Sequence, residues 1–160
     1  MLAIACDRSI TAPGVADAVL RTPAQRRSER RVGATVDELL VRFNLTAQRE
    51  QRTSELSTGQ RRIVDLAALL ADEPSIVLLD EPSSGLAQAE VEALGDLLRR
   101  VHDELRLTMV IVEHDIALVA SLADRLVVLD QGRIIATGPP TDVLADERVI
   151  SSYLGVATPA

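Results

Sequence analysis

Two adjacent carboxylates, Asp80 and Glu81, follow directly on a run of four apolar residues, Ile76 to Leu79. Such a short, wholly apolar run is typical of a strand that is buried on both faces of a parallel sheet. Ligands of α/β proteins bind at the carboxyl ends of the strands, so both acids are expected at a ligand-binding edge. There one carboxylate can hold a hydrated Mg²⁺, and the next can orient or deprotonate an attacking water. The alternative is a strand that simply runs into a polar turn.

The segment Leu56 to Gln60, with the sequence LSTGQ, comes directly before a predicted helix. The start of a helix offers unpaired N–H groups and the positive end of the helix dipole, both of which suit phosphate. Gly59 would let an anion approach the backbone, and the Ser57 hydroxyl would add a donor. Ser57 and Gln60 are also spaced as a capping box, which would stabilise any helix. The segment therefore supports two interpretations, a phosphate-binding helix start and an ordinary helix cap.

A histidine, His114, follows the apolar run 108–112, which is predicted as a second buried strand. It would leave the same sheet edge as Asp80, where an imidazole could reach a γ-phosphate. A lone histidine after a strand is more often incidental, and His102, on a polar helix face, is assigned no role. The occurrence of four such segments in one order is stronger evidence of a shared function than any single segment. Along the chain come LSTGQ, the acidic strand end, Ser84-Gly85-Leu86 and His114.

Strands and helices alternate around these segments. Apolar residues recur at helical spacing over 34–43, 60–71, 88–105 and 116–122. Strands are predicted at 76–79, 108–112 and 125–129, the last joined to 133–136 as a hairpin. Residues 14–31 are predicted as two helical pieces interrupted by Pro23, 46–55 as a loop, and Thr141 as the cap of a last helical stretch. The pattern predicts an α/β fold with a mainly parallel sheet and flanking helices. Its expected parts are an N-terminal helical lobe (1–55), an α/β core (56–138) and a C-terminal helical end (139–160).

The composition argues against several classes of protein. A formal net charge of −7 opposes a dedicated nucleic-acid binder, because such proteins carry a net basic face. The single cysteine, Cys6, cannot form an intramolecular disulfide, which fits a reducing compartment. No apolar run approaches the ~20 residues of a membrane span. We therefore expect a soluble chain with no direct membrane insertion, which reaches a membrane only through other subunits.

Lysine is absent from the sequence, and all 17 basic residues are arginines. A phosphate-binding loop of the type GxxxxGK[ST] needs a lysine whose compact ammonium reaches the β- and γ-phosphates. The 160 residues therefore contain no such loop.

Taken together, these segments resemble the ABC ATPase family. LSTGQ is similar to its signature motif, IVLLDE (76–81) to its Walker B motif, SSGLA (83–87) to its D-loop and EHD (113–115) to its H-loop. The chain also resembles the ATP-binding subunits of branched-chain amino-acid importers, in the segment 20–27 and in the ending from Asp130 to Gly155. The resemblance covers residues 16–155. It implies an incomplete P-loop NTPase fold in which the P-loop strand is missing.

The resemblance implies roles for individual residues. Ser57, Gly59 and Gln60 would contact the phosphates of an ATP held by an opposing subunit, and Ser84, Gly85 and Leu86 would form the D-loop. Asp80 would hold Mg²⁺ through water, Glu81 would be the catalytic base, and His114 would sense the γ-phosphate. Two positions depart from the family pattern: Thr58 where many members have glycine, and Ala87 where Asp or Asn is common. The second departure weakens the case for signalling across a dimer through this loop.

The implied cofactors are ATP and Mg²⁺. The implied partners are a second ABC ATPase subunit and transmembrane permease subunits, and the implied location is the cytoplasmic face of the cell membrane. One hypothesis is the ATPase subunit of an importer, cut short, that couples ATP hydrolysis to uptake of branched-chain amino acids or similar solutes. The other is a non-catalytic interaction subunit that donates its signature motif to a full-length partner. A helicase-type ATPase is opposed by the acidic charge.

Two expectations follow from the missing loop. The isolated chain should not hydrolyse ATP, because phosphoryl transfer needs the phosphates cradled by the loop and its lysine. Without the P-loop strand, the strands 108–112 and 125–129 would also lose a shared neighbour. Either the gap between them stays open as a groove or the two strands pair directly. The groove would be lined by Val110, Val112, Val127 and Leu129.

Overall fold

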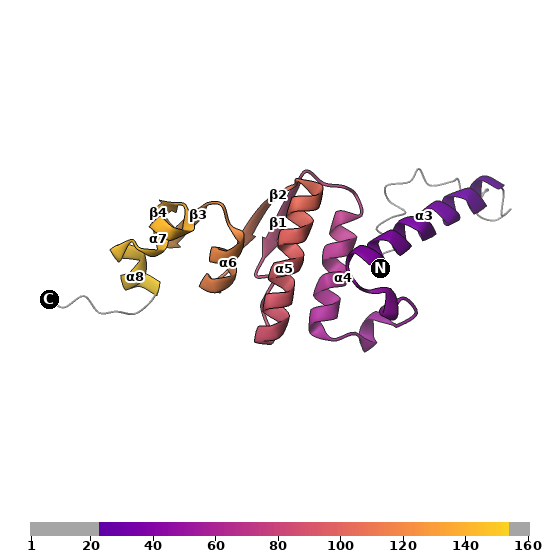
Figure 1. Ribbon diagram of the computed structural model, residues 1–160, viewed down its shortest axis with the longest axis horizontal. Coiled ribbons are helices and arrows are strands. Elements are labelled where there is room, and N and C mark those ends of the chain that lie inside the picture. Colours follow the sequence, from indigo (N-terminus) through magenta and orange to yellow (C-terminus); the bar gives the residue numbers. More distant parts are fainter. Residues whose placement is uncertain (1–22, 154–160) are drawn as a thin grey trace.

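The computed structural model describes residues 23–153, with strands between helices along an elongated molecule (Figure 1). The helices are α3 (Pro23–Arg42), α4 (Thr58–Leu70), α5 (Gln88–Leu105), α6 (Ile116–Leu122), α7 (Pro140–Leu144) and α8 (Glu147–Tyr153). The strands are β1 (Ile76–Asp80), β2 (Thr108–Val112), β3 (Leu126–Asp130) and β4 (Arg133–Gly138). Two short 3-10 helices, η1 (Thr46–Gln48) and η2 (Thr53–Glu55), occupy the segment predicted as a loop.

Helix α3 runs without a break from Pro23 to Arg42. It therefore joins the second of the two predicted helical pieces to the helix predicted over 34–43, because no breaker stronger than Gly33 separates them. Residues 14–22, the first predicted piece, lie outside the described residues. Phe43 continues the helical bonding beyond α3, since its N–H donates to the carbonyl of Leu39 at 2.9 Å, and Asn44, with φ 56°, then ends the helical run.

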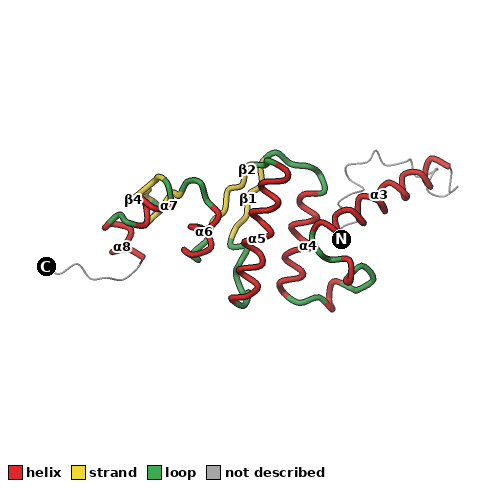
Figure 2. The backbone as a smooth tube through the Cα atoms, in the orientation of Figure 1, coloured by secondary structure: helices red, strands yellow, loops and turns green. Residues whose placement is uncertain are grey.

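The main apolar core lies between α4, α5 and one face of the β1–β2 pair (Figure 2). The two strands are parallel, in a register that sets Ile76 beside Thr108 and Asp80 beside Val112. Val77 of β1 is 2% exposed and packs into this core together with Leu98 and Val101 of α5. The predicted bounds of α5, β2 and α6 are those of the structure.

The prediction that these strands are buried on both faces was wrong. Leu78 of β1 is 72% exposed, and Val110, its partner on β2, is 50% exposed. Both lie on the face of the strand pair opposite α4 and α5, together with Ile76 and Val112. In the described part of the chain no element covers this face. Each of the two strands is therefore apolar on both faces, although one face is buried and the other is exposed to solvent.

The second sheet is an antiparallel hairpin of β3 and β4, as predicted, with a bulge between Val128 and Leu129. Helices α7 and α8 pack on it through a separate small core of Ala136, Val143 and Val149. Thr141 lies inside α7, whose N-cap is Pro139, so the prediction that Thr141 caps a helix was wrong. Proline suits this start because its missing N–H would have no helical partner there.

The α/β class is confirmed, but the strands form two small sheets, one parallel and one antiparallel. No pairing joins β2 to β3. The predicted direct pairing of the two strands is therefore absent among the described residues, while the predicted groove stays a prediction. The residues expected to line it are half-exposed: Val110, Val112, Val127 and Leu129.

Candidate ATP-binding and catalytic site

The LSTGQ segment forms the start of α4 and is a complete capping box. The Ser57 Oγ accepts a hydrogen bond from the Gln60 N–H at 3.1 Å, and the Gln60 Oε1 accepts one from the Ser57 N–H at 2.9 Å. The helix-cap interpretation is thus confirmed. It does not exclude the other, because a hydroxyl that accepts one bond still has its own hydrogen to donate. The Gln60 amide likewise keeps its NH₂ group as a donor.

Gly59 is buried, and a carboxylate of this chain already lies against it. A β-carbon built on Gly59 would lie 2.7 Å from Oε1 of Glu90, on α5. The other oxygen of Glu90 accepts the Ala87 N–H at 3.1 Å and so caps α5. Sequence reasoning attributed the glycine to the approach of a bound anion; here the approaching carboxylate is intramolecular. Gly59 therefore lies where a side chain would meet Glu90, while its phosphate-binding role stays a prediction.

Asp80 and Glu81 lie at the carboxyl end of β1, as predicted. The Glu81 N–H donates to the carbonyl of Val112 at 2.8 Å, which extends the β1–β2 pairing by one residue. The backbone of Glu81 is left-handed, with φ 45°, a conformation that costs an ordinary residue about 1–2 kcal/mol. This kink ends the strand, and the Glu81 side chain is 55% exposed.

The structure brings His114 and Glu81 together. The Nδ1 atom of His114 lies 4.0 Å from Oε1 of Glu81, and the imidazole is 71% exposed. The two side chains come from the loops that follow β1 and β2, which meet because the strands are parallel neighbours. The predicted juxtaposition at one sheet edge is therefore present for Asp80, Glu81 and His114. No hydrogen bond or ion pair within residues 23–153 links them to Ser57, Gly59 or Gln60.

The segment SSGLA makes two turns directly after Glu81. Ser84 N–H donates to the Glu81 carbonyl at 3.1 Å, and Leu86 N–H donates to the Ser83 carbonyl at 3.1 Å. Gly85 has φ 77°, a left-handed conformation that glycine adopts without strain. These turns return the chain to the start of α5 and keep the loop close to the sheet edge.

Glu113, which sequence reasoning passed over, joins the loop after β2 to the loop after β1. Its Oε1 accepts the Ser83 N–H at 2.7 Å, and its Oε2 accepts the His114 N–H at 3.2 Å. The carboxylate has no exposed surface. Burial raises the pKa of Glu113, but bonds from the Ser83 hydroxyl and N–H and from the N–H groups of His114 and Asp115 outweigh it, so the pKa of Glu113 lies below the ordinary value of a glutamate. A glutamate beside a predicted site histidine was the available sequence signal.

This lowered pKa predicts an acid-sensitive contribution to stability. Because folding lowers the pKa, the carboxylate stabilises the fold above the unfolded-state pKa, and this stabilisation is lost as the pH falls through the folded-state pKa. The histidine facing it, His114, has Nδ1 3.8 Å from Oε2. Urea unfolding should therefore give a large difference between wild type and Glu113→Gln at pH 7 and a smaller one near about pH 3. An unchanged difference between the two pH values would contradict the assignment.

The residues at the sheet edge fit a magnesium–nucleotide complex better than a metal ion alone. No group of three or more His, Cys, Asp or Glu side chains in the described part of the chain could hold a metal. Mg²⁺ is usually held by one or two carboxylates together with substrate phosphates and water. Asp80, with Glu81 beside it as the expected base, matches the protein's share of such a set.

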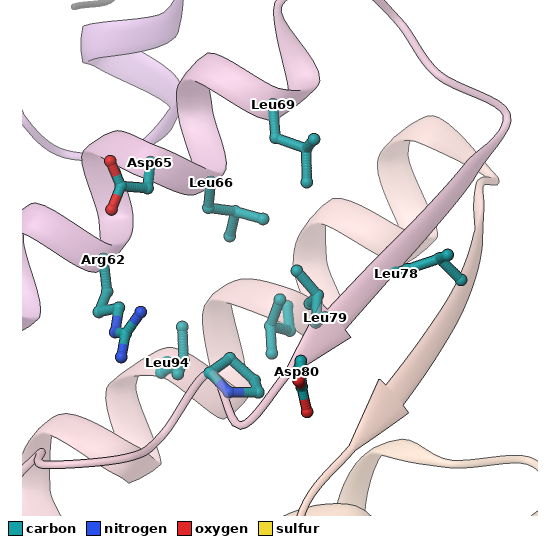
Figure 3. A pocket seen from close by; sticks show the side chains of 10 residues that line it. Arg62, Asp65, Leu66, Leu69, Leu78, Leu79, Asp80 and Leu94 are labelled. Carbon is teal, nitrogen blue, oxygen red and sulfur yellow. The ribbon is translucent and has the colours of Figure 1, made fainter.

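A hollow of about 240 Å³ adjoins Asp80, beside the edge of β1 that does not pair with β2 (Figure 3). Leu66 and Leu69 of α4 face Leu79 across it, and Arg62 also lines it. Among the described strands, β1 has a neighbour on one edge alone, β2. The hollow is thus a mostly apolar groove beside a free strand edge, with Arg62, Asp65 and Asp80 also in its lining.

Comparison with known proteins agrees with this geometry. The family described as "ABC transporter" matches residues 11–84, and the one described as "Branched-chain amino acid ATP-binding cassette transporter" matches residues 133–158. The chain is similar to the high-affinity branched-chain amino acid transport ATP-binding protein BraF of Pseudomonas aeruginosa. The two are 36% identical over 139 residues, or 87% of this chain and 54% of BraF.

Two further relatives show the breadth of the likeness. The sulfate/thiosulfate import ATP-binding protein CysA of Mycobacterium bovis is 39% identical over 136 residues, which cover 84% of this chain and 39% of CysA. The solved structure of cbiO1 from Clostridium perfringens, part of the ABC transporter complex cbiONQ, has a TM-score of 0.69 and 33% identity. That match covers 81% of this chain and 51% of cbiO1.

These matches show that the chain belongs to the ABC transporter ATP-binding family, with the fold of its ATPase domains. Within that family it resembles the ATPase subunits of branched-chain amino-acid importers. The chain spans about half the length of BraF. In the described residues no helix has both the length and the apolarity needed to cross a membrane.

Proposed function

We propose that this chain supplies the hydrolytic half of an ATP site in an ABC importer, which couples ATP hydrolysis to the uptake of branched-chain amino acids or similar solutes. The observation that carries the proposal is the meeting of Glu81 and His114, 4.0 Å apart, beside Asp80 at one sheet edge. The likeness to BraF supports the importer class.

Each residue has a distinct part in the proposed reaction. The Glu81 carboxylate orients the attacking water and takes its proton, while the His114 imidazole bonds a γ-phosphate oxygen. Asp80 holds Mg²⁺ through water; when bound, the ion neutralises charge on the β- and γ-phosphates. Ser57, Gly59 and Gln60 direct hydroxyl, backbone and amide donors at the phosphates of an ATP bound by an opposing subunit.

The phosphate-binding loop must come from residues outside these 160, because they contain no lysine. The proposed assembly therefore contains this chain, a loop-bearing ATPase segment or subunit, and transmembrane permease subunits that hold the ATPases at the cytoplasmic face of the membrane. Without the loop, the 160 residues alone should neither bind ATP tightly nor hydrolyse it.

Ser57 offers a test, because its two roles can be separated by substitution. Ser57→Asp should keep the helix cap, since aspartate is among the best N-caps, but place a negative charge where the phosphate is proposed to bind. We expect unchanged unfolding of the chain and a roughly 10²–10³-fold fall in turnover of the assembled ATPase, from charge repulsion of about 3–4 kcal/mol.

Ser57→Ala is the matched control. It should lose the cap, about 1 kcal/mol of stability, and a single phosphate hydrogen bond, which lowers turnover by roughly tenfold or less. Full turnover in Ser57→Asp would show that no phosphate approaches this helix start. A fall in turnover that tracks stability across both variants would assign Ser57 to capping alone.

A further inference from the structure

We propose that Glu113 is a positioning residue that sets the distance between Glu81 and His114, an inference that rests on the function proposed above. The buried carboxylate is held from two loops at once, through the N–H groups of Ser83 and His114 at 2.7 and 3.2 Å. Its side chain has no exposed surface, and in the proposed reaction it does not contact the substrate.

The hydrogen bonds on both sides of Glu81 explain why its loop needs to be held by the Glu113 carboxylate. The Glu81 N–H donates to the Val112 carbonyl, and the Glu81 carbonyl accepts the Ser84 N–H. The N–H of Ser83, two residues after Glu81, donates to the Glu113 carboxylate. Glu81 itself has a left-handed backbone, which an unconstrained glutamate avoids. The bond from Ser83 to Glu113 thus holds the loop in the conformation that directs Glu81 toward His114.

The same residue fixes the other member of the pair. His114 follows Glu113 directly, and its backbone N–H donates to the carboxylate. The Glu113 side chain therefore fixes the backbone position of His114. Through Ser83 it also fixes the backbone of the loop that carries Glu81, the proposed base. Loss of the carboxylate should let the two loops separate, and a displacement of about 1 Å at a reacting group can cost about 10²-fold in rate.

Replacing Glu113 by Gln tests the proposal in the assembled ATPase. The amide has a single acceptor oxygen, so it can serve the Ser83 N–H or the His114 N–H but presents its NH₂ group to the other, and either the bond between the loops or the bond to His114 is lost. We expect kcat to fall about 10- to 100-fold with the KM for ATP changed less than about threefold. Glu92→Gln, an exposed carboxylate on α5, is the matched control and should have no effect.

A double variant separates positioning from simple loss of stability. If Glu113 acts through Glu81 as well as His114, then Glu113→Gln should have a clearly smaller effect in a Glu81→Gln background than in the wild type, because only the part that acts through His114 remains. Val101→Ala, which removes core packing far from both loops, should leave kcat unchanged at temperatures where it stays folded.

The outcomes are distinguishable. If Glu81→Gln has no effect on turnover, the proposed function itself fails. If Glu81→Gln abolishes turnover but Glu113→Gln leaves kcat intact, or if the two effects multiply in the double variant, the proposed function survives and the positioning role of Glu113 is wrong.

Discussion

Replacing Glu81 by Gln is expected to lower the ATP turnover of the assembled ATPase by about 10²–10⁴-fold, the usual contribution of a general base. The substitution keeps the size of the side chain and leaves the backbone hydrogen bonds of residue 81 in place but removes the proton acceptor. ATP binding should be retained, because the phosphates are held mainly by the phosphate-binding loop. Steady-state turnover and equilibrium nucleotide binding, measured on the same preparation, check both halves of the prediction.

Glu73 provides a close control for this experiment. It is also an exposed glutamate with a left-handed backbone, φ 48°, but it lies before β1, at the opposite end of the strand from Glu81. Glu73→Gln should therefore leave turnover unchanged. Equal effects at the two positions, or a fall of less than about threefold in Glu81→Gln, would show that Glu81 is not the base.

The second large effect concerns the uncovered face of the strand pair. We expect the 160-residue chain expressed alone to be largely insoluble, because exposed apolar strands with free edges are templates for aggregation. Replacing Leu78 and Val110 by Thr should raise the soluble fraction severalfold without lowering the free energy of unfolding, since both side chains are already at least half-exposed. Sedimentation after lysis and urea unfolding measure the two quantities.

Val77 gives the matched comparison one residue away. Val77 is 2% exposed and points into the core. Val77→Thr should cost about 1–3 kcal/mol, because it buries a hydroxyl without a partner. A soluble wild-type chain with a single sharp melt above about 65 °C, beyond the usual mesophile range, would overturn the prediction.

The sequence predicted the elements of the main core and most of the site, for identifiable reasons. The periodicity of α5 and the short apolar runs of β1 and β2 left little ambiguity about type or bounds, and parallel pairing then placed Asp80, Glu81 and His114 at one edge. The exposure of Leu78 could not be predicted, because a run without alternation does not say which face is covered. Glu113 was missed because its role depends on Ser83, thirty residues away.

The capping contacts show a second limit of sequence reasoning. The spacing of Ser57 and Gln60 was enough to predict the capping box, since the interaction is local. The packing of Glu90 against Gly59 depends instead on how α4 and α5 lie together, and nothing in the LSTGQ segment points to it. The phosphate-binding roles of Ser57, Gly59 and Gln60 stay predictions.

The presence of two separate cores affects how the free energy of unfolding of each variant must be measured. One core includes α4, α5, β1 and β2, while the other lies between the β3–β4 hairpin and helices α7 and α8. Units that share few apolar contacts can unfold independently, so a single midpoint does not define the stability of such a chain. The aromatic residues fall one in each, Phe43 in the first core and Tyr153 on α8, where its hydroxyl donates to the Leu129 carbonyl. Tyrosine fluorescence therefore reports on the unfolding of the hairpin unit alone. The effects of substitutions at Ser57, Val77 and Glu113 must be measured with a probe placed within the first core.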